Sequence, residues 1–307
     1  MSAARTGKHA ALCALLAYAF FGFSFAFSKM ALQLTSPAVL LAARFLVAFV
    51  VSNLLLLTGK FKVSFRGKPI GKLLLLGILD PLIYFYSEAY GILYTNSAFS
   101  GVMIALIPLA ALLMGAFFLR EHPTGMQVGF CLLSIVGVVL ITLQNGADGV
   151  IRPLGVLLLI VSVLSAAGFT VLGRDLAQTF TPFERSYFII LLGVVVFIVI
   201  AVLQNLHQPA ALLAPFAHPS FWLAIGYLGI CCSVGSYFLM NYAVTYLTAA
   251  RVAAFCNVTT VLSIFTGVVF MKEPFHLLSC VAAVMILIGI WGVQRGERKQ
   301  TPSPPAE

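Results

Sequence analysis

The sequence predicts an all-α integral membrane protein with ten transmembrane helices, built as two inverted five-helix repeats. Three observations predict this class: the excess of apolar residues, the length of the apolar runs and an internal repeat. Apolar residues make up 61% of the 307 positions and charged residues 9%, whereas a soluble domain carries about 25% charge. Lipid is the natural cover for so much apolar surface. Continuous runs of about 20 residues fit helices, because barrel strands need only about 10 residues.

The internal repeat is clearest over Tyr94 to Glu121, since a diverged second copy runs from Tyr246 to Glu273. Arg120-Glu121 and Lys272-Glu273 are the most informative match, because Glu is scarce and each pair follows a long apolar run. The same shift of 152 residues pairs Tyr90 with Tyr242, Ala98 with Ala250, Gly115 with Gly267, Phe118 with Phe270 and Gly137 with Gly289. Upstream, at a shift of 145 residues, Lys29 with Ser36-Pro37 matches Arg174 with Thr181-Pro182. Two related halves are therefore expected.

Apolar runs and the prolines near their starts place the ten helices. We expect a cytoplasmic N-terminus over residues 1–9, a first repeat over 10–145, an inverted second repeat over 146–294 and a disordered cytoplasmic tail over 295–307. The predicted helices cover residues 10–28, 37–57, 71–92, 95–119, 125–143, 154–173, 183–203, 220–242, 247–270 and 276–294.

Basic residues predict how the chain crosses the membrane. With the N-terminus inside, cytoplasmic segments hold fourteen Lys and Arg and the opposite side holds three, Lys29, Arg152 and Lys272, with Arg44 inside a helix. This bias predicts N-in and C-in orientation in a cell membrane, with the second repeat inverted. Two halves of opposite orientation suit a carrier that exposes a midplane site alternately to each side.

The net charge of +9 does not indicate a nucleic-acid partner, because the basic residues are spread between apolar runs. The six cysteines lie inside apolar runs without metal-ligand spacing, so neither a metal nor another cofactor is expected. The expected partners are a small-molecule substrate and the lipid bilayer.

Several motifs resemble those of the EamA-type members of the drug/metabolite transporter superfamily. They are Gly22 and Lys29, Pro37 and Arg44, the run FYSEAYGILYTNSA leading into Pro108, and the RE and KEP endings. The resemblance covers residues 10–294 and implies ten helices, a central cavity and transport, often export, of amino acids or other small metabolites. The sequence departs from the family pattern at Phe21-Gly22, where Trp-Gly is common, and at Thr260, which replaces the proline of the first half.

Two charged residues inside the predicted helices are candidates for substrate binding. Arg44 lies seven residues into the second helix, about 10 Å deep, and Glu88 lies at a similar depth in the third. A zwitterionic amino acid could place its carboxylate at Arg44 and its ammonium group at Glu88. A structural ion pair, or an Arg44 that reaches outward to the interface, would explain the same residues without function.

Asp80 stands in the run GILDP, directly before Pro81. It is expected either to cap a helix broken at Pro81 or, as Glu88 also could, to carry the proton of a proton-coupled cycle. Lys29 either complements a helix dipole or meets an anionic substrate at the cavity mouth. Pro108 is expected to kink the fourth helix.

Glu121 and Glu273 are expected to fix turns at helix ends or to gate opposite faces. Neutral polar residues of the apolar runs supply further candidates for the cavity wall, although each can equally serve as an interhelical hydrogen-bond partner. These candidates are Tyr84, Ser100, Tyr237, Asn241 and Asn257, with Tyr86, Ser24 and Ser28.

Other function classes fit the sequence less well. No GxxxxGK[ST], HExxH or GxSxG motif occurs, so neither ATP hydrolysis nor an intramembrane enzyme is indicated. A channel or receptor fits an inverted repeat less well than a carrier does. The alternative substrate is an organic phosphate or nucleotide sugar, which would need several basic residues in the cavity, whereas only Arg44 and Lys29 qualify.

Overall fold

The computed structural model describes residues 3–59, 61–118, 124–147, 151–176, 179–246, 255–273 and 276–300. All regular structure within these ranges is helical, without a strand, as the sequence predicts. Among them, six runs are long and apolar enough to cross a membrane: His9–Leu32, Pro37–Leu57, Ile70–Tyr94, Pro153–Thr170, Pro182–Gln204 and Pro219–Met240. Shorter apolar helices cover Ser97–Ala110, Val128–Leu140, Val258–Val269 and Leu277–Gly289.

The helices of the two halves follow one another with short connections. The first half contains α1 (Ala3–Leu32), α2 (Pro37–Leu57), α3 (Ile70–Gly77), η1 (Ile78–Ile83), α4 (Tyr84–Tyr94), α5 (Ser97–Ile104), α6 (Ile107–Phe118) and α7 (Gly125–Ala147). The second half contains α8 (Pro153–Leu176), α9 (Pro182–Gln204), α10 (Ala210–Leu213), η2 (Ala214–Ala217), α11 (Pro219–Gly226), η3 (Tyr227–Ser236), α12 (Tyr237–Tyr246), α14 (Cys256–Val269) and α15 (Leu277–Gln300).

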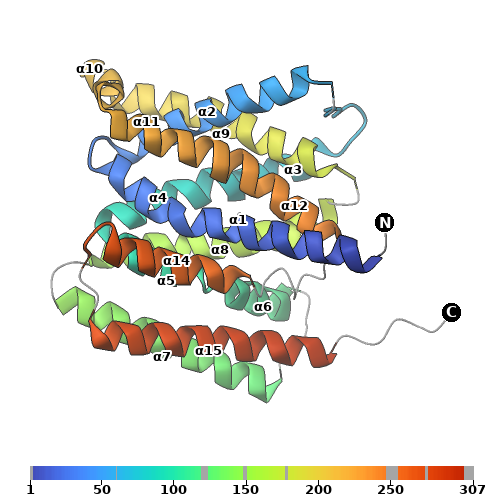
Figure 1. Ribbon diagram of the computed structural model, residues 1–307, viewed down its shortest axis with the longest axis vertical. Coiled ribbons are helices and arrows are strands. Elements are labelled where there is room, and N and C mark those ends of the chain that lie inside the picture. The colour runs from blue at the N-terminus through green and yellow to red at the C-terminus, as the bar shows by residue number, and fades with distance from the viewer. Residues whose placement is uncertain are drawn as a thin grey trace.

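The two halves interleave along their length. Helices α2 and α9, α4 and α8, α1 and α14, and α7 and α15 contact one another across the halves. The start of α1 and the end of α15 lie at the same end of the bundle (Figure 1). The core between the halves includes Phe25 of α1, Leu40 of α2 and Phe221 of α11, all nearly fully buried. Neither half therefore forms its core alone.

Two glycines at matched positions of the repeat pack α7 against α15. A Cβ on Gly137 would lie 2.8 Å from the carbonyl oxygen of Ala282, and a Cβ on Gly289 would lie 2.0 Å from Oγ of Ser134. Each helix thus uses its glycine to let the backbone of the other approach. The repeat that the sequence shows is in this way also a packing relation between equivalent helices.

Two helices of the predicted plan break beside a proline, and the expected helix over 220–242 contains the π-helical segment η3 between α11 and α12. The expected helix over 71–92 divides into α3, the π-helical segment η1 and α4, because Asp80 has non-helical φ −136° and ψ 113°. The expected helix over 95–119 divides at residues 105–106 into α5 and α6, with Pro108 in the first turn of α6. Proline lacks the N–H that would continue the helical ladder, so both breaks lie beside a proline.

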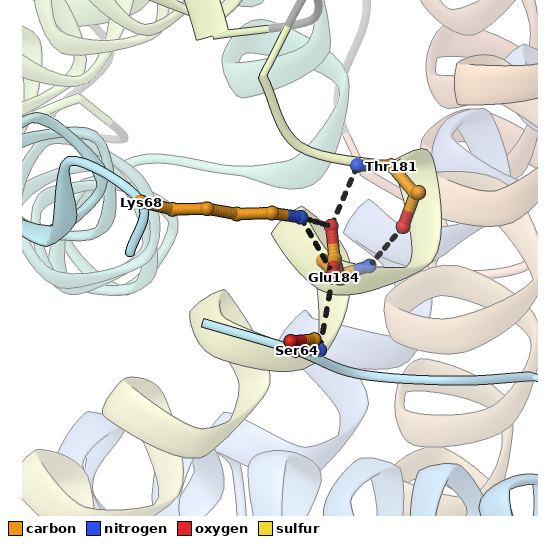
Figure 2. Close-up of polar contacts among 4 residues, drawn as sticks. All are labelled: Ser64, Lys68, Thr181 and Glu184. Atoms are coloured by element: carbon orange, nitrogen blue, oxygen red, sulfur yellow. Dashed lines mark hydrogen bonds and ion pairs between the residues drawn. The ribbon is translucent and has the colours of Figure 1, made fainter. Parts of the chain in front are cut away.

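A carboxylate at the start of α9 ties this helix to the loop between α2 and α3. Glu184 and Thr181 form a capping box, in which the Thr181 hydroxyl accepts from the Glu184 N–H and the Glu184 carboxylate accepts from the Thr181 N–H. The same carboxylate accepts from the Ser64 N–H at 3.0 Å and forms an ion pair with Lys68 at 2.6 Å (Figure 2). One buried Glu184 side chain therefore orders two segments.

Replacing Glu184 by Gln should lower the stability of the folded protein, because a charged acceptor of several hydrogen bonds is lost. The free energy of unfolding should fall by about 1–3 kcal/mol, measured as a lower midpoint of thermal unfolding in detergent. Lys62→Gln changes an exposed side chain of the same loop and should alter stability by less than about 0.5 kcal/mol. Equal midpoints for the two variants would contradict this role of Glu184.

Candidate functional site

The site is built where η1 and α2 of the first half meet the start of α12 and η3 of the second half. The interruption at Asp80 leaves the carbonyl oxygen of Leu79 available, and the Ser165 hydroxyl of α8 donates to it at 2.7 Å. Among the described residues, no backbone N–H freed by the break at Pro81 donates to the Asp80 side chain. Its Oδ1 instead accepts from the Tyr237 hydroxyl at 2.7 Å. The capping interpretation of Asp80 is therefore wrong, and the carboxylate joins the two halves.

Arg44 of α2 lies inside the bundle, with 2% of its surface exposed. Its Nε donates to Oγ of Ser233 at 2.9 Å. Its guanidinium lies 4.1 Å from the ring centre of Phe85 and 5.9 Å from that of Phe45, within the range of a cation–π contact. The Arg44 side chain therefore does not extend outward to the membrane interface. This structural explanation for Arg44 is wrong.

Ser233 can meet Arg44 because η3 is π-helical over Tyr227–Ser236. Its hydroxyl donates to the carbonyl oxygen of Leu228, five residues earlier, at 2.9 Å. Such wide turns shift side chains out of the α-helical register and are frequent at functional sites. No pattern in the sequence marks a π-helix, so Ser233 was not among the predicted site residues. Nor was Phe85, one of 26 phenylalanines.

Glu88 of α4 is buried and accepts at Oε1 from the Tyr84 hydroxyl, one turn earlier, at 2.8 Å. Glu88 and Arg44 do not form the ion pair that was the other structural explanation for them. Over the described residues, the one ion pair within 4 Å is Lys68–Glu184.

The structure thus gathers five of the predicted site residues, which we call the polar cluster together with Ser233. Its members are Arg44, Asp80, Tyr84, Glu88, Ser233 and Tyr237. Arg44 interacts electrostatically with both Asp80 and Glu88 without touching either. The remaining charged atoms, Nη1 and Nη2 of Arg44, Oδ2 of Asp80 and Oε2 of Glu88, make no hydrogen bond to the described part of the chain.

Aromatic rings surround the polar cluster. Tyr84 and Tyr237 both contact the apolar group that contains Phe45, Phe85 and Phe197. The Tyr237 ring also meets the Phe21 ring edge to face, with centres 6.1 Å apart. The polar cluster can therefore offer one cation and two carboxylates inside an aromatic wall, an arrangement that can hold a small solute with both charge and apolar surface.

Other predicted site residues lie elsewhere. Ser100 is buried at the start of α5, where its hydroxyl donates to the carbonyl oxygen of Asn96, outside the polar cluster. Lys29 and Glu273 both lie at the turn between α4 and α5. Pro108 lies in α6. Glu121 and the side chains of Asn241 and Asn257 lie outside the described residues.

Comparison with known proteins identifies the class to which this fold and site belong. The sequence pattern of the EamA-like transporter family matches this chain twice, over residues 8–143 and 153–295. The chain is therefore a multi-pass membrane protein of a transporter class, and in a bacterium its membrane is the plasma membrane. It belongs to the EamA-like transporter family, within the drug/metabolite transporter superfamily.

Individual relatives agree with this assignment. "Uncharacterized transporter YcxC" of Bacillus subtilis (strain 168) is 35% identical over 300 residues, covering 96% of each chain. "WAT1-related protein At1g44800" of Arabidopsis thaliana is 23% identical over 261 residues, covering 76% of this chain and 70% of its own. A crystal structure of a protein 18% identical in sequence matches the fold with a TM-score of 0.65, over 96% of this chain and 99% of the other. The family and the Bacillus subtilis relative are both described as transporters.

Proposed function

We propose that this protein is a secondary carrier that exports amino acids or similar zwitterionic metabolites by alternating access. The observation that carries the proposal is the polar cluster, in which one guanidinium and two carboxylates are buried at a contact between the halves without an ion pair. A charged group inside a membrane costs at least about 2.5–3.5 kcal/mol. Such a cost is sustained where the charges serve a substrate or an ion.

The substrate class follows from the charges. The Nη atoms of Arg44 present two parallel donors for a carboxylate. One carboxylate oxygen of Glu88 accepts from the Tyr84 hydroxyl, and the other oxygen can accept from an ammonium group. Organic phosphates and nucleotide sugars need several cations, and Arg44 is the one cation that the described residues place in the polar cluster. A zwitterion with an apolar side chain suits this set of groups and its aromatic wall.

The transport cycle uses the halves as predicted from the sequence. We propose ten membrane-spanning helices with both termini in the cytoplasm, as repeats 10–145 and 146–294 of opposite orientation. The start of α1 and the end of α15 at one end of the bundle support an even number of crossings (Figure 1). The hydrogen bond between Asp80 and Tyr237 joins the halves, so exchange between inward-open and outward-open states changes the surroundings of this carboxylate.

We infer that Asp80 carries the coupling proton. As a carboxylate it accepts from Tyr237, and after protonation it no longer carries the charge that this hydrogen bond stabilises. Proton entry from outside would then accompany substrate export. Glu88 instead binds the substrate ammonium group. The two carboxylates therefore have different roles, proton coupling for Asp80 and substrate binding for Glu88.

Counterflow in proteoliposomes tests the substrate class. Vesicles that contain the purified protein and an internal pool of unlabelled amino acids should accumulate labelled amino acid, whereas vesicles loaded with sugar phosphates should not accumulate labelled phosphate. Arg44→Ala and Glu88→Gln should raise the half-saturating concentration of substrate by about 30-fold or more. Loss of one partner of a buried charge costs about 2–5 kcal/mol of binding free energy.

Glu184→Gln is the matched control, since it removes a carboxylate whose partners lie outside the polar cluster and should leave the half-saturating concentration unchanged. Normal transport by folded Arg44→Ala and Glu88→Gln would contradict the assignment of the site. Exchange of phosphates with no movement of amino acids would assign the other substrate class.

A pH gradient tests the proton. A gradient of one pH unit supplies about 1.4 kcal/mol per proton. Wild-type vesicles with an acidic interior and substrate outside should therefore accumulate the substrate up to about tenfold. Asp80→Asn should still exchange labelled for unlabelled substrate but should lose this accumulation. A wild-type rate independent of the gradient, or an Asp80→Asn variant that still responds to it, would exclude Asp80 as the coupling group.

A further inference from the structure

The turn between α4 and α5 is held by two charged side chains from distant parts of the chain. The first is Lys29, near the end of α1. Its Nζ donates to the carbonyl oxygens of Ile92 and Thr95, each at 3.0 Å. These carbonyls belong to the C-terminal end of α4, where a cation is favourable to the helix dipole. Lys29 thus complements the end of another helix rather than its own.

The second charged side chain is Glu273, which follows α14 in the other half. Its Oε1 accepts from the Ser97 N–H at 2.8 Å, and its Oε2 accepts from the Ala98 N–H at 3.0 Å and from the Ser97 hydroxyl at 2.8 Å. A carboxylate at the N-terminal end of α5 is favourable to the dipole of that helix. Glu273 lies close enough to Lys29 for the two charges to interact.

Helix α5 does not depend on Glu273 for its cap. Asn96 is its N-cap residue, and Oδ1 of Asn96 accepts from the Phe99 N–H at 2.7 Å. Glu273 adds bonds to the two preceding N–H groups, and it comes from the second half whereas α5 belongs to the first. The Glu273 carboxylate is therefore a contact between the halves that was added to an already capped helix.

The backbone that presents Glu273 is strained and tightly packed. Lys272 has a φ of 53°, a left-handed conformation that is uncommon outside glycine. A Cβ on Gly267 would lie 2.6 Å from Oε2 of Glu273 and 3.0 Å from Cβ of Ala98. Glycine at position 267 is thus required for the carboxylate to lie between α14 and α5.

Below this contact, α5 and α14 meet through small and hydroxyl-bearing residues. A Cβ on Gly101 would lie 1.8 Å from Oγ of Ser263. The Thr260 hydroxyl donates to the carbonyl oxygen of Gly101 at 3.4 Å. Small residues bring the backbones close without interlocking large side chains. We call this contact the α5–α14 seam.

The charged contact lies between the polar cluster and one end of the bundle. Thr95 comes seven residues after Glu88, a distance of about 10 Å along a helix. Helix α1 contacts α4, α5 and α14 around it, and α5 contacts both α4 and α14. Its end of the bundle is the one at which α1 ends, which is the outer end in the orientation proposed above.

We propose that Lys29 and Glu273 form a releasable clasp that closes the outer side of the substrate site. If Glu273 leaves, the N–H groups of Ser97 and Ala98 need water as their new partner, because buried backbone donors are not left unpaired. Release of the clasp and entry of water along the α5–α14 seam therefore occur together. The clasp rests on the proposed carrier function and adds to it the contact that opens.

Cysteine labelling tests the clasp without a substrate. Ser263→Cys places a thiol at the fully buried centre of the seam. A membrane-impermeant maleimide added to intact cells should label it slowly in the otherwise wild-type chain. Glu273→Gln should speed the labelling by at least about fivefold, because a charged acceptor of three hydrogen bonds is lost. Labelling of the chain without Ser263→Cys is subtracted, because native cysteines are present.

Gly267→Ala gives a second test, since its methyl group displaces the carboxylate that Glu273→Gln neutralises. Gly267→Ala should also speed the labelling. It provides the test of the clasp if the Glu273→Gln variant does not reach the membrane. Glu184→Gln, the same chemical change at another helix start, should leave labelling unchanged.

Unchanged labelling in folded Glu273→Gln and Gly267→Ala would overturn the clasp. Faster labelling confined to inside-out vesicles would overturn its assignment to the outer side. Because no substrate enters this assay, its result is independent of whether amino-acid counterflow is observed.

Discussion

A polar group buried in hydrocarbon must find its partner within the protein, and the interior of this bundle depends on that constraint. The break at Asp80 leaves a carbonyl oxygen that Ser165 of the other half satisfies. The π-helical turn of η3 places Ser233 against Arg44. These irregular segments occur where the two halves face each other, so their polar groups are satisfied across the contact. The break in the first half places Asp80 at that contact, and the π-helical turn places Ser233 there.

The same constraint explains how the contact between the halves differs from place to place. At α7 and α15, matched glycines bring two helices into close backbone contact. At α2 and η3 the contact contains the buried Arg44. At α5 and α14 it contains small residues and one carboxylate. A carrier needs some contacts that persist and others that separate, and the charged contacts are the ones whose partners water or substrate can replace.

The sequence predicted the helical membrane fold and the repeat because these depend on composition and periodicity. Both can be seen in the order of residues along the chain. It also predicted Arg44, Asp80, Tyr84, Glu88 and Tyr237, since polar residues are few in so apolar a chain. It did not predict which of them meet. The bond between Asp80 and Tyr237 spans 157 residues and depends on a helix break, and Ser233 depends on a π-helical turn that no residue pattern marks.

For other candidates the sequence could not separate the possible roles. Lys29 and Glu273 stand at helix ends, where dipole complementation is expected. Only the folded chain shows that both act on the α4–α5 turn and that Glu273 arrives from the other half. Ser100 looked like a cavity residue because it is polar within an apolar run, yet its hydroxyl bonds within its own helix start.

Thermal unfolding of the purified protein with added solutes tests the central claim, that the polar cluster binds a zwitterion, most directly. A ligand at 100 times its dissociation constant stabilises a folded protein by about 2.7 kcal/mol. If the claim holds, zwitterionic amino acids raise the midpoint of wild-type unfolding, sugar phosphates do not, and Arg44→Ala loses the response. A rise produced by sugar phosphates alone, or an equal rise in folded Arg44→Ala, would contradict it.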